Sequence, residues 1–388
     1  MDIYGGNGDS LKCFKKEEES EMRIVLTGGC TGGHIYPAIA IGDKFREKDP
    51  NCEIIFVGHE YGLETKIVPA AGYDLKIITA DWLRRENPVK AINTVINTSK
   101  GRREALKILK SFKPDAVVST GSFVSVPTVL AARATGTPIY MHEQNGFPGV
   151  SNRTFANWAK TVFLGFDGAR NYFKKNVDLM YSGNPVRKEF YNRDSAADRK
   201  ELEIPADDMV ITVFGGSLGS GTTNEIGKNI IKEFGGRSGY TIVFGTGSDY
   251  YDEVRAELDR EDLGKFSNVR VNPYIANMPQ VLSASSLVIS RAGALSVAEV
   301  TMTGTPAIFV PSPNVTADHQ YYNAKAVADR GGAIIVREDD NTAQNVMKEI
   351  LKLDTDRDRL KTMEKASAAL APVDAADIIY NRIMETYR

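Results

Sequence analysis

The sequence predicts an α/β protein with two Rossmann-like domains, each a doubly wound parallel sheet, that face each other across a cleft. The first observation is a glycine-rich turn in each half of the chain, at residues 28–34 and 215–220, between an apolar run and a helical pattern. The second is the alternation of short apolar runs with helical patterns, which is typical of parallel sheets covered on both faces. At 388 residues the chain is long enough for two domain cores.

The apolar runs are the expected strands, at residues 22–27, 53–57, 116–119, 139–142, 161–164, 209–214, 241–245, 287–290, 307–310 and 333–336. In open parallel sheets, ligands bind beyond the carboxyl ends of the strands. Glycine, small and polar residues cluster after these runs, at residues 28–34, 120–125, 142–149, 215–220, 291–296 and 311–320. We therefore expect these loops to form the functional site.

Gly183-Asn184-Pro185 is the expected hinge between the domains, because proline ends the structure that precedes it. This divides the chain into an N-terminal domain at residues 22–185 and a C-terminal domain at residues 186–372. A last helix within residues 373–388 is expected to pack back on the N-terminal domain. Residues 1–21 are polar, with a charged end, so we expect a disordered leader or tag there.

The composition argues against several classes of protein. A net charge of -2 gives no general attraction to nucleic acid. The three cysteines, Cys13, Cys30 and Cys52, are too few and too scattered for a disulfide framework, which favours a reducing cytoplasm. No stretch approaches the ~20 apolar residues that span a bilayer. No Asp-x-Asp motif lies in a suitable loop, so we expect no metal and no other cofactor.

The first glycine turn departs from two well-known nucleotide motifs. Cys30 replaces the middle glycine of a dinucleotide fingerprint, and the second strand is followed by Gly58 instead of an acidic residue. Neither turn ends in the Gly-Lys-Ser/Thr of a P-loop. Because glycine allows close backbone approach and a helix N-terminus attracts anions, the turns favour a phosphorylated ligand. The alternative is that the glycines only make tight turns.

His34 stands at the predicted start of the first helix. The positive end of the helix disfavours the imidazolium, so a neutral ring could act as a base near neutral pH. A capping or packing histidine is the alternative. The run His142-Glu143-Gln144-Asn145 follows a buried strand, where polar side chains are costly unless they bond to a ligand or to one another. A polar network that braces the loop before Pro148 is the alternative there.

In the second half, Glu299 lies one turn into a helix that follows small residues at 292–296. Its carboxylate could accept hydrogen bonds from two ribose hydroxyls, while the small residues let a phosphate meet the backbone. Ser296 and Glu299 also have the spacing of a capping box, which is the alternative. The side chains at 318–320 and Asn323 add donors and acceptors that suit sugar hydroxyls.

Seven motifs, in this order, resemble those of the MurG family of glycosyltransferases. They are Gly28-Gly29-Cys30-Thr31-Gly32-Gly33-His34; Gly62-Leu63-Glu64 with Val68-Pro69; His142-Glu143-Gln144-Asn145 with Pro148-Gly149 and Asn152; Gly183-Asn184-Pro185-Val186-Arg187; Gly215-Gly216-Ser217-Leu218-Gly219; Arg291-Ala292-Gly293-Ala294; and Asp318-His319-Gln320 with Asn323-Ala324. The resemblance spans residues 22–388. Two positions depart from the family pattern: Cys30 stands where the family usually has glycine, and Leu218 stands where it often has glutamine.

The resemblance implies a GT-B glycosyltransferase of peptidoglycan synthesis that moves GlcNAc from UDP-GlcNAc to the 4-hydroxyl of MurNAc in lipid I, with inversion, to give lipid II. It implies a C-terminal domain for the donor and an N-terminal domain for the acceptor. The donor contacts carried over are Thr31, Gly32, His34, Asn145, Arg187, Ser217, Ala294, Leu295, Glu299, Gln320 and Asn323. The acceptor and its phosphates are expected at Gly28, Gly29, Gly33, Gly121 and Ser122.

The reaction needs a base for the acceptor hydroxyl and positive groups for the departing UDP. His34 is the candidate base and Glu143 the second choice. The helix N-termini after Gly215 and Arg291 are expected to hold the diphosphate. Two alternatives remain: another GT-B enzyme, such as a UDP-GlcNAc 2-epimerase or a glycolipid synthase, and a nucleotide-sugar sensor without catalysis.

The segment Asp81-Trp82-Leu83-Arg84-Arg85 places apolar side chains beside two cations. Val89, Ile92, Val95 and Ile96 follow at helical spacing, a mix that suits the surface of an anionic membrane. An ordinary helix face packed on the sheet is the alternative. With the resemblance, which implies a lipid-linked acceptor, we expect peripheral contact with the cytoplasmic face of the cell membrane. Other proteins of cell-wall synthesis are possible partners.

Overall fold

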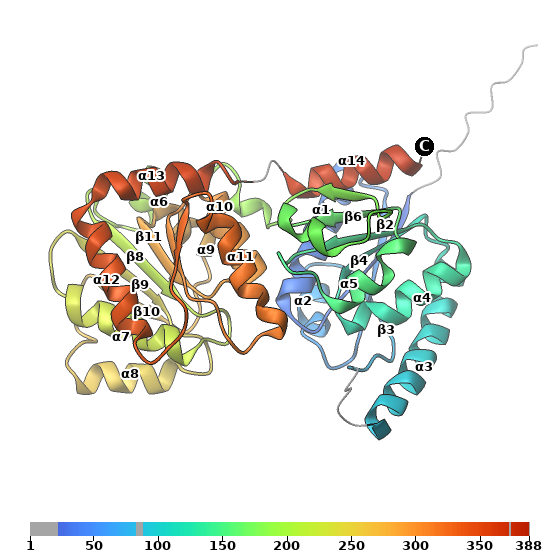
Figure 1. Ribbon diagram of the computed structural model, residues 1–388, viewed down its shortest axis with the longest axis horizontal. Coiled ribbons are helices and arrows are strands. Elements are labelled where there is room, and N and C mark those ends of the chain that lie inside the picture. Colours follow the sequence, from blue (N-terminus) through green and yellow to red (C-terminus); the bar gives the residue numbers. More distant parts are fainter. Residues whose placement is uncertain (1–21, 83–87, 372–373, 388) are drawn as a thin grey trace, which may run out of the picture.

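The computed structural model describes residues 22–82, 88–371 and 374–387, and this part of the chain forms two parallel-sheet domains (Figure 1). From edge to edge, the N-terminal sheet consists of β3 (Asp74–Ile77), β2 (Glu53–Gly58), β1 (Arg23–Gly28), β4 (Ala116–Gly121), β5 (Ile139–Glu143), β6 (Thr161–Leu164) and β7 (Leu179–Tyr181). The C-terminal sheet consists of β10 (Val269–Asn272), β9 (Tyr240–Gly245), β8 (Met209–Phe214), β11 (Leu287–Ser290), β12 (Ala307–Phe309) and β13 (Ala333–Ile335).

Helices connect the parallel strands. Those of the N-terminal half are α1 (Gly32–Lys48), α2 (Glu64–Ala70), α3 (Pro88–Phe112), α4 (Val126–Thr135) and α5 (Val150–Phe155). Those that follow are α6 (Ser195–Glu201), α7 (Gly221–Phe234), α8 (Tyr251–Arg260), α9 (Met278–Ala284), α10 (Ala294–Met302), α11 (His319–Ala328), α12 (Thr342–Thr355), α13 (Arg357–Ala368) and α14 (Ala375–Tyr387). Short 3-10 turns lie at Phe123–Ser125, Ala156–Trp158, Asp167–Tyr172, Lys188–Phe190 and Thr316–Asp318.

Every apolar run predicted to be a strand is one, within a few residues at its ends. The list of runs lacks β3, β7 and β10. All three are edge strands, and their residues are half-buried or exposed. An edge strand needs no continuous apolar run because solvent reaches it, which explains why the apolar pattern does not include them.

Alternation along the central strands builds a core on both faces of each sheet. In β1, Ile24 and Leu26 pack toward α1, whereas Val25 packs toward α3 and α4. In β11, Ile289 packs toward α7 and α12, whereas Val288 packs toward α10. Successive side chains of a strand point to opposite faces, so a strand covered on both sides must be apolar at every position.

The last helix, α14, returns to the N-terminal domain and lies against α1 (Figure 1). Its Ile379 and Ile383 are buried in the core below β1, and the Tyr380 ring meets the ring of Phe45 with centroids 4.9 Å apart. Lys44 on α1 also pairs with Asp374 at 2.7 Å. The N-terminal domain is therefore assembled from two separate pieces of chain.

Candidate active site between the two domains

A cavity of about 260 Å³ lies between the domains. The N-terminal domain contributes the start of α1, and the C-terminal domain contributes the loops that follow β8, β9, β10 and β11. Its lining residues are Gly32, Gly33, Tyr36, Arg187, Phe214, Gly216, Ser217, Gly245, Gly247, Pro273, Tyr274, Ile275, Met278, Gly293, Ala294, Leu295, Ser296 and Glu299. The cavity thus lies at the carboxyl ends of the C-terminal strands, where α/β sheets bind ligands.

Six predicted donor contacts line this cavity: Gly32, Arg187, Ser217, Ala294, Leu295 and Glu299. Tyr36, Tyr274 and Met278 also line the cavity, although none of them belongs to a sequence motif. An isolated tyrosine in a helical pattern, such as Tyr36, is typical of a packing residue, and Tyr274 follows the edge strand β10, which was missing from the predicted strands. The local sequence therefore held no signal for these side chains.

Glu299 presents its carboxyl group to the cavity from α10. Burial raises the pKa of this carboxyl to about 7, and the nearby Arg187 guanidinium opposes the rise. The capping-box alternative does not form, because α10 begins after Gly293 and no side chain caps it. Glu299 is half-buried at the cavity wall, where an ionised carboxylate gains from hydrogen-bond donors on a ligand.

The start of α10 lines the C-terminal wall of the cavity, and the loop that leads into α7 lines it at Gly216 and Ser217. The residues preceding α7 and α10, Ser220 and Gly293, make no side-chain hydrogen bond to the first turn of their helices. The first backbone N–H groups of a helix have no partner within it and carry partial positive charge. Both helix starts are therefore suited to an anionic group such as a diphosphate.

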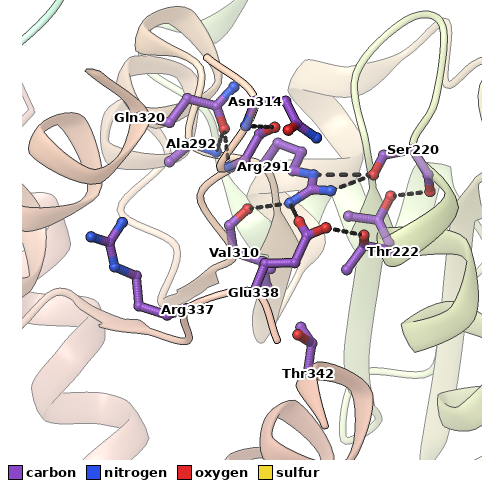
Figure 2. Close-up of polar contacts among 12 residues, drawn as sticks. Ser220, Thr222, Arg291, Ala292, Val310, Asn314, Gln320, Arg337, Glu338 and Thr342 are labelled. Atoms are coloured by element: carbon purple, nitrogen blue, oxygen red, sulfur yellow. Dashed lines mark hydrogen bonds and ion pairs between the residues drawn. The ribbon is translucent and has the colours of Figure 1, made fainter. Parts of the chain in front are cut away.

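Arg291 explains why Ser220 does not cap α7 (Figure 2). Its guanidinium donates to the Ser220 hydroxyl from Nε at 3.1 Å and from Nη2 at 2.8 Å, and it also pairs with Glu338. Thr222 donates to the same Glu338 carboxylate at 2.9 Å. Arg291 thus braces the ends of β11 and β13 against the start of α7 and leaves the N–H groups of α7 uncapped.

His34 follows the two cavity-lining glycines of α1 and is only partly exposed. Its Nδ1 lies 2.8 Å from the backbone oxygen of Thr120 and 3.1 Å from Oε1 of Gln144. Since a carbonyl oxygen can only accept, Nδ1 carries the hydrogen. The neutral ring then has its lone pair on Nε2, the atom that could take a proton.

Glu143 braces its own loop. One carboxylate oxygen accepts from the Asn145 backbone N–H at 2.9 Å, and the other accepts from the Gly149 N–H at 2.9 Å and from Asn152 Nδ2 at 2.9 Å. Both oxygens are thus occupied by donors of the protein itself, and Glu143 is not among the residues that line the cavity. This geometry argues against Glu143 as the base and supports the polar-network interpretation of this loop.

Asn323 joins the two domains. Its Oδ1 accepts from the Gly146 N–H at 2.7 Å, and its Nδ2 donates to Asn145 Oδ1 at 3.2 Å and to the Ala292 carbonyl at 3.1 Å. Asn145 and Asn323 were both expected to contact the donor; in the structure their side chains bond to each other across the domain boundary. Gln320 is similarly engaged, because its Oε1 accepts from the Ser312 N–H at 2.9 Å.

The first glycine turn packs largely against the protein. A Cβ on Gly28 would overlap the Thr120 hydroxyl, and one on Gly29 would overlap the carboxylate of Glu64. Glu64 is fully buried and accepts from the Cys30 N–H at 2.9 Å. Gly28 and Gly29, both expected to bind the acceptor, are buried in a tight turn that has no room for a side chain, whereas Thr31 and Gly33 are exposed.

The second acceptor loop bends beside His34. Gly121 and Ser122 both have positive φ, 93° and 74°. A Cβ on Gly121 would lie 3.2 Å from Asn152 Nδ2 and 3.5 Å from His34 Cε1. The left-handed backbone thus lets the chain pass close to the imidazole without a side chain in the way.

The predicted membrane segment is described only at Asp81 and Trp82; Leu83, Arg84 and Arg85 lie outside the described residues. Trp82 is 57% exposed and meets the edge of Phe123 with ring centroids 5.7 Å apart. On α3, Ile92, Val95 and Ile96 are each about 60% exposed, so this helix face does not pack on the sheet. No helix in the described part of the chain is long and apolar enough to cross a membrane.

The chain matches two family models: the glycosyltransferase family 28 N-terminal domain over residues 24–164 and the glycosyltransferase family 28 C-terminal domain over residues 210–379. It is 38% identical to the UDP-N-acetylglucosamine--N-acetylmuramyl-(pentapeptide) pyrophosphoryl-undecaprenol N-acetylglucosamine transferase of Alkaliphilus metalliredigens, over 94% of this chain and 99% of the relative. The protein of the same name from Clostridioides difficile is also 38% identical, over 94% of this chain and 89% of the relative.

Among solved structures, the crystal structure of Acinetobacter baumannii MurG superposes with a TM-score of 0.74 and 25% identity, over 94% of this chain and 99% of that one. A UDP-GlcNAc 2-epimerase from Neisseria meningitidis, bound to UDP-GlcNAc, has a TM-score of 0.65 over 94% and 100% of the chains. Its identity is only 16%, so it shows the shared fold alone. The chain therefore belongs to glycosyltransferase family 28 and, within it, to the MurG family of N-acetylglucosamine transferases.

Proposed function

We propose that this protein transfers GlcNAc from UDP-GlcNAc to the 4-hydroxyl of MurNAc in lipid I and so forms lipid II for peptidoglycan. The observation that carries the proposal is the cavity between the domains. Its C-terminal wall combines the uncapped start of α10 and the glycine loop that leads into α7 with Glu299. This combination suits a nucleoside diphosphate sugar. The two relatives that are 38% identical to this chain are named as N-acetylglucosamine transferases that act on N-acetylmuramyl-(pentapeptide) pyrophosphoryl-undecaprenol.

In this proposal the donor occupies the C-terminal wall. Glu299 accepts the ribose hydroxyls, and the starts of α7 and α10 receive the diphosphate. Ser217 and the backbone at Ala294 and Leu295, which line the cavity, complete the contacts. As the bond between GlcNAc and UDP breaks, negative charge grows on the diphosphate, and fixed N–H groups stabilise that charge without a metal.

The acceptor approaches from the N-terminal domain, where His34 is the base. Its Nε2 takes the proton of the 4-hydroxyl while the hydroxyl oxygen attacks the anomeric carbon from the face opposite UDP, so the configuration inverts. Asn145 and Asn323 are placed to hold the two domains in register for this attack, since they bond each other directly across the domain boundary.

Turnover of UDP-GlcNAc with a soluble lipid I analogue tests the function. We expect one UDP released for each disaccharide product formed. Formation of an epimerised sugar nucleotide without acceptor would instead identify a 2-epimerase. Binding of UDP-GlcNAc without turnover, in a folded protein supplied with lipid I analogue, would favour a sensor.

We also propose that the protein meets the cytoplasmic face of the membrane through Trp82, the segment at 83–85 and the exposed face of α3. Apolar side chains at this surface can enter the headgroup boundary, and each cation gains about 1 kcal/mol near anionic lipid. The exposure of Ile92, Val95 and Ile96 supports the proposal. A lipid-linked acceptor also has to be reached where its chain is anchored.

Flotation with anionic vesicles at low and high salt tests the membrane proposal. We expect the wild type to float with the vesicles at low salt and to float less at high salt. The variant Trp82→Ser, Arg84→Glu, Arg85→Glu should not float with the vesicles. The control is Arg255→Glu, Lys265→Glu, which makes the same change in net charge on the C-terminal domain and should float like the wild type. Equal failure of the wild type and the triple variant to float would rule the surface out.

A further inference from the structure

A chain of hydrogen bonds links His34 to the segment that joins the domains. His34 Nδ1 lies 3.1 Å from Gln144 Oε1, and Gln144 Nε2 lies 3.0 Å from His142 Nδ1. His142 Nε2 in turn lies 3.1 Å from the backbone oxygen of Gly183. All four residues belong to motifs of the sequence, but neither His142 nor Gln144 has a role in the proposed reaction.

Backbone carbonyls at both ends fix the direction of these bonds. The Gly183 oxygen can only accept, so His142 carries its hydrogen on Nε2 and its Nδ1 is an acceptor. That acceptor selects the amide orientation of Gln144 in which Nε2 faces His142 and Oε1 faces His34. The Thr120 oxygen, 2.8 Å from His34 Nδ1, requires a hydrogen on that nitrogen. The reversed amide would set two donors against each other.

Burial keeps the arrangement in one state. His142 and Gln144 are both inaccessible to solvent, with 0% and 2% exposure. Burial also lowers the pKa of His142 to about 4, so its ring stays neutral at neutral pH and Nδ1 remains an acceptor. The backbone of Gln144 is held as well, since its carbonyl accepts from Asn184 Nδ2 at 3.0 Å.

We propose that Gln144, oriented by His142, is a positioning residue that holds His34 with its hydrogen on Nδ1 and its lone pair on Nε2. The inference rests on the proposed transferase function for the role of Nε2, but the tautomer itself does not depend on turnover. When Nε2 takes the acceptor proton, Nδ1–H becomes part of a cation. Gln144 Oε1 and the Thr120 carbonyl then stabilise that charge, and a hydrogen bond to a charged group is stronger than one to a neutral group.

The tautomer can be read without substrate by NMR of isotope-labelled imidazole nitrogens in the full chain. The chain has four histidines, and loss of one set of signals in His34→Gln assigns His34. We expect the wild-type signals of the Nδ1–H form. A His34 that carries its hydrogen on Nε2, or exchanges between both forms, would overturn the proposal whether or not the protein is a transferase.

Kinetics of Gln144→Met test the contribution to catalysis. This variant removes the acceptor but keeps the size of the side chain. We expect kcat to fall about tenfold, the worth of one hydrogen bond to a charged group, with the KM for UDP-GlcNAc unchanged. Gln144→Glu, which restores an oxygen acceptor for Nδ1–H, should recover most of kcat and keep the Nδ1–H signals.

Thr128→Val is the matched control, because it also replaces a buried polar side chain of the same domain, one whose hydroxyl has no hydrogen-bond partner among the described residues. It should leave kcat as in the wild type. Should Gln144→Met fail to fold, the tautomer of His34 in the wild type and the kcat of Gln144→Glu still test the proposal. Unchanged kcat in a folded Gln144→Met, or a loss of kcat in Gln144→Glu equal to that in Gln144→Met, would contradict the positioning role.

Discussion

Replacing His34 with alanine should lower kcat by about 10² to 10⁴, the usual contribution of a general base, and leave the melting temperature close to that of the wild type. The imidazole is partly exposed, and within residues 22–82, 88–371 and 374–387 its hydrogen-bond partners, Thr120 and Gln144, both lie at Nδ1. Little of the fold therefore depends on it. Initial rates with UDP-GlcNAc and a lipid I analogue, together with a thermal melt, provide the measurement.

Glu143→Gln is the informative comparison. Its carboxylate accepts hydrogen bonds on both oxygens, and an amide can offer only one oxygen to those donors. We expect it to lower stability by about 1 to 3 kcal/mol, the cost of leaving buried donors unpaired, and thus to lower the melting temperature. Near-normal turnover by a folded His34→Ala variant would move the role of base to Glu143 or to water.

Replacing Glu299 with alanine should weaken UDP binding by about 1 to 3 kcal/mol, or roughly 5- to 150-fold. The reason is the loss of hydrogen bonds from the ribose hydroxyls to a half-buried carboxylate at the cavity wall. Titration calorimetry with UDP measures the change. Unchanged UDP affinity in a folded variant would remove Glu299 from the donor site.

The raised pKa of Glu299 predicts that affinity for UDP-GlcNAc depends on pH. Ribose hydroxyls donate to the ionised form, and the pKa of the empty site is about 7, so affinity for UDP-GlcNAc should fall as the pH drops below about 7. Glu299→Gln should remove this dependence. The sign for stability is opposite: because the folded pKa lies above the ordinary value of 4.5, the empty protein loses stability as the pH rises from about 4.5 to 7.

The sequence predicted the central strands because burial on both faces requires apolar residues at every position, a demand that is visible locally. Edge strands such as β3 and β10 are only partly buried, so their sequences do not need a continuous apolar run and do not contain one. The same distinction applies to the site. The position of Glu299 at the cavity could be predicted because it and the small residues beside it lie within one strand-to-helix segment.

Contacts between distant segments could not be predicted in this way. Asn323, on α11, and Gly146 are 177 positions apart, and nothing in the sequence around either residue indicates that the amide would bond to the other domain rather than to a sugar. For Glu143, the sequence left a catalytic and a bracing role open. Only the positions of the Gly149 N–H and the Asn152 amide favour the second.

The return of α14 to the N-terminal domain sets the order in which the domains can be completed during synthesis. The ribosome produces all the strands of the C-terminal sheet before it produces α14. Until then the core below β1 lacks Ile379 and Ile383, and the side of α1 that they cover faces water. Domains generally fold as units as their chain emerges. The C-terminal domain, whose chain is continuous, can therefore be finished first, and the N-terminal domain is translated first but finished last.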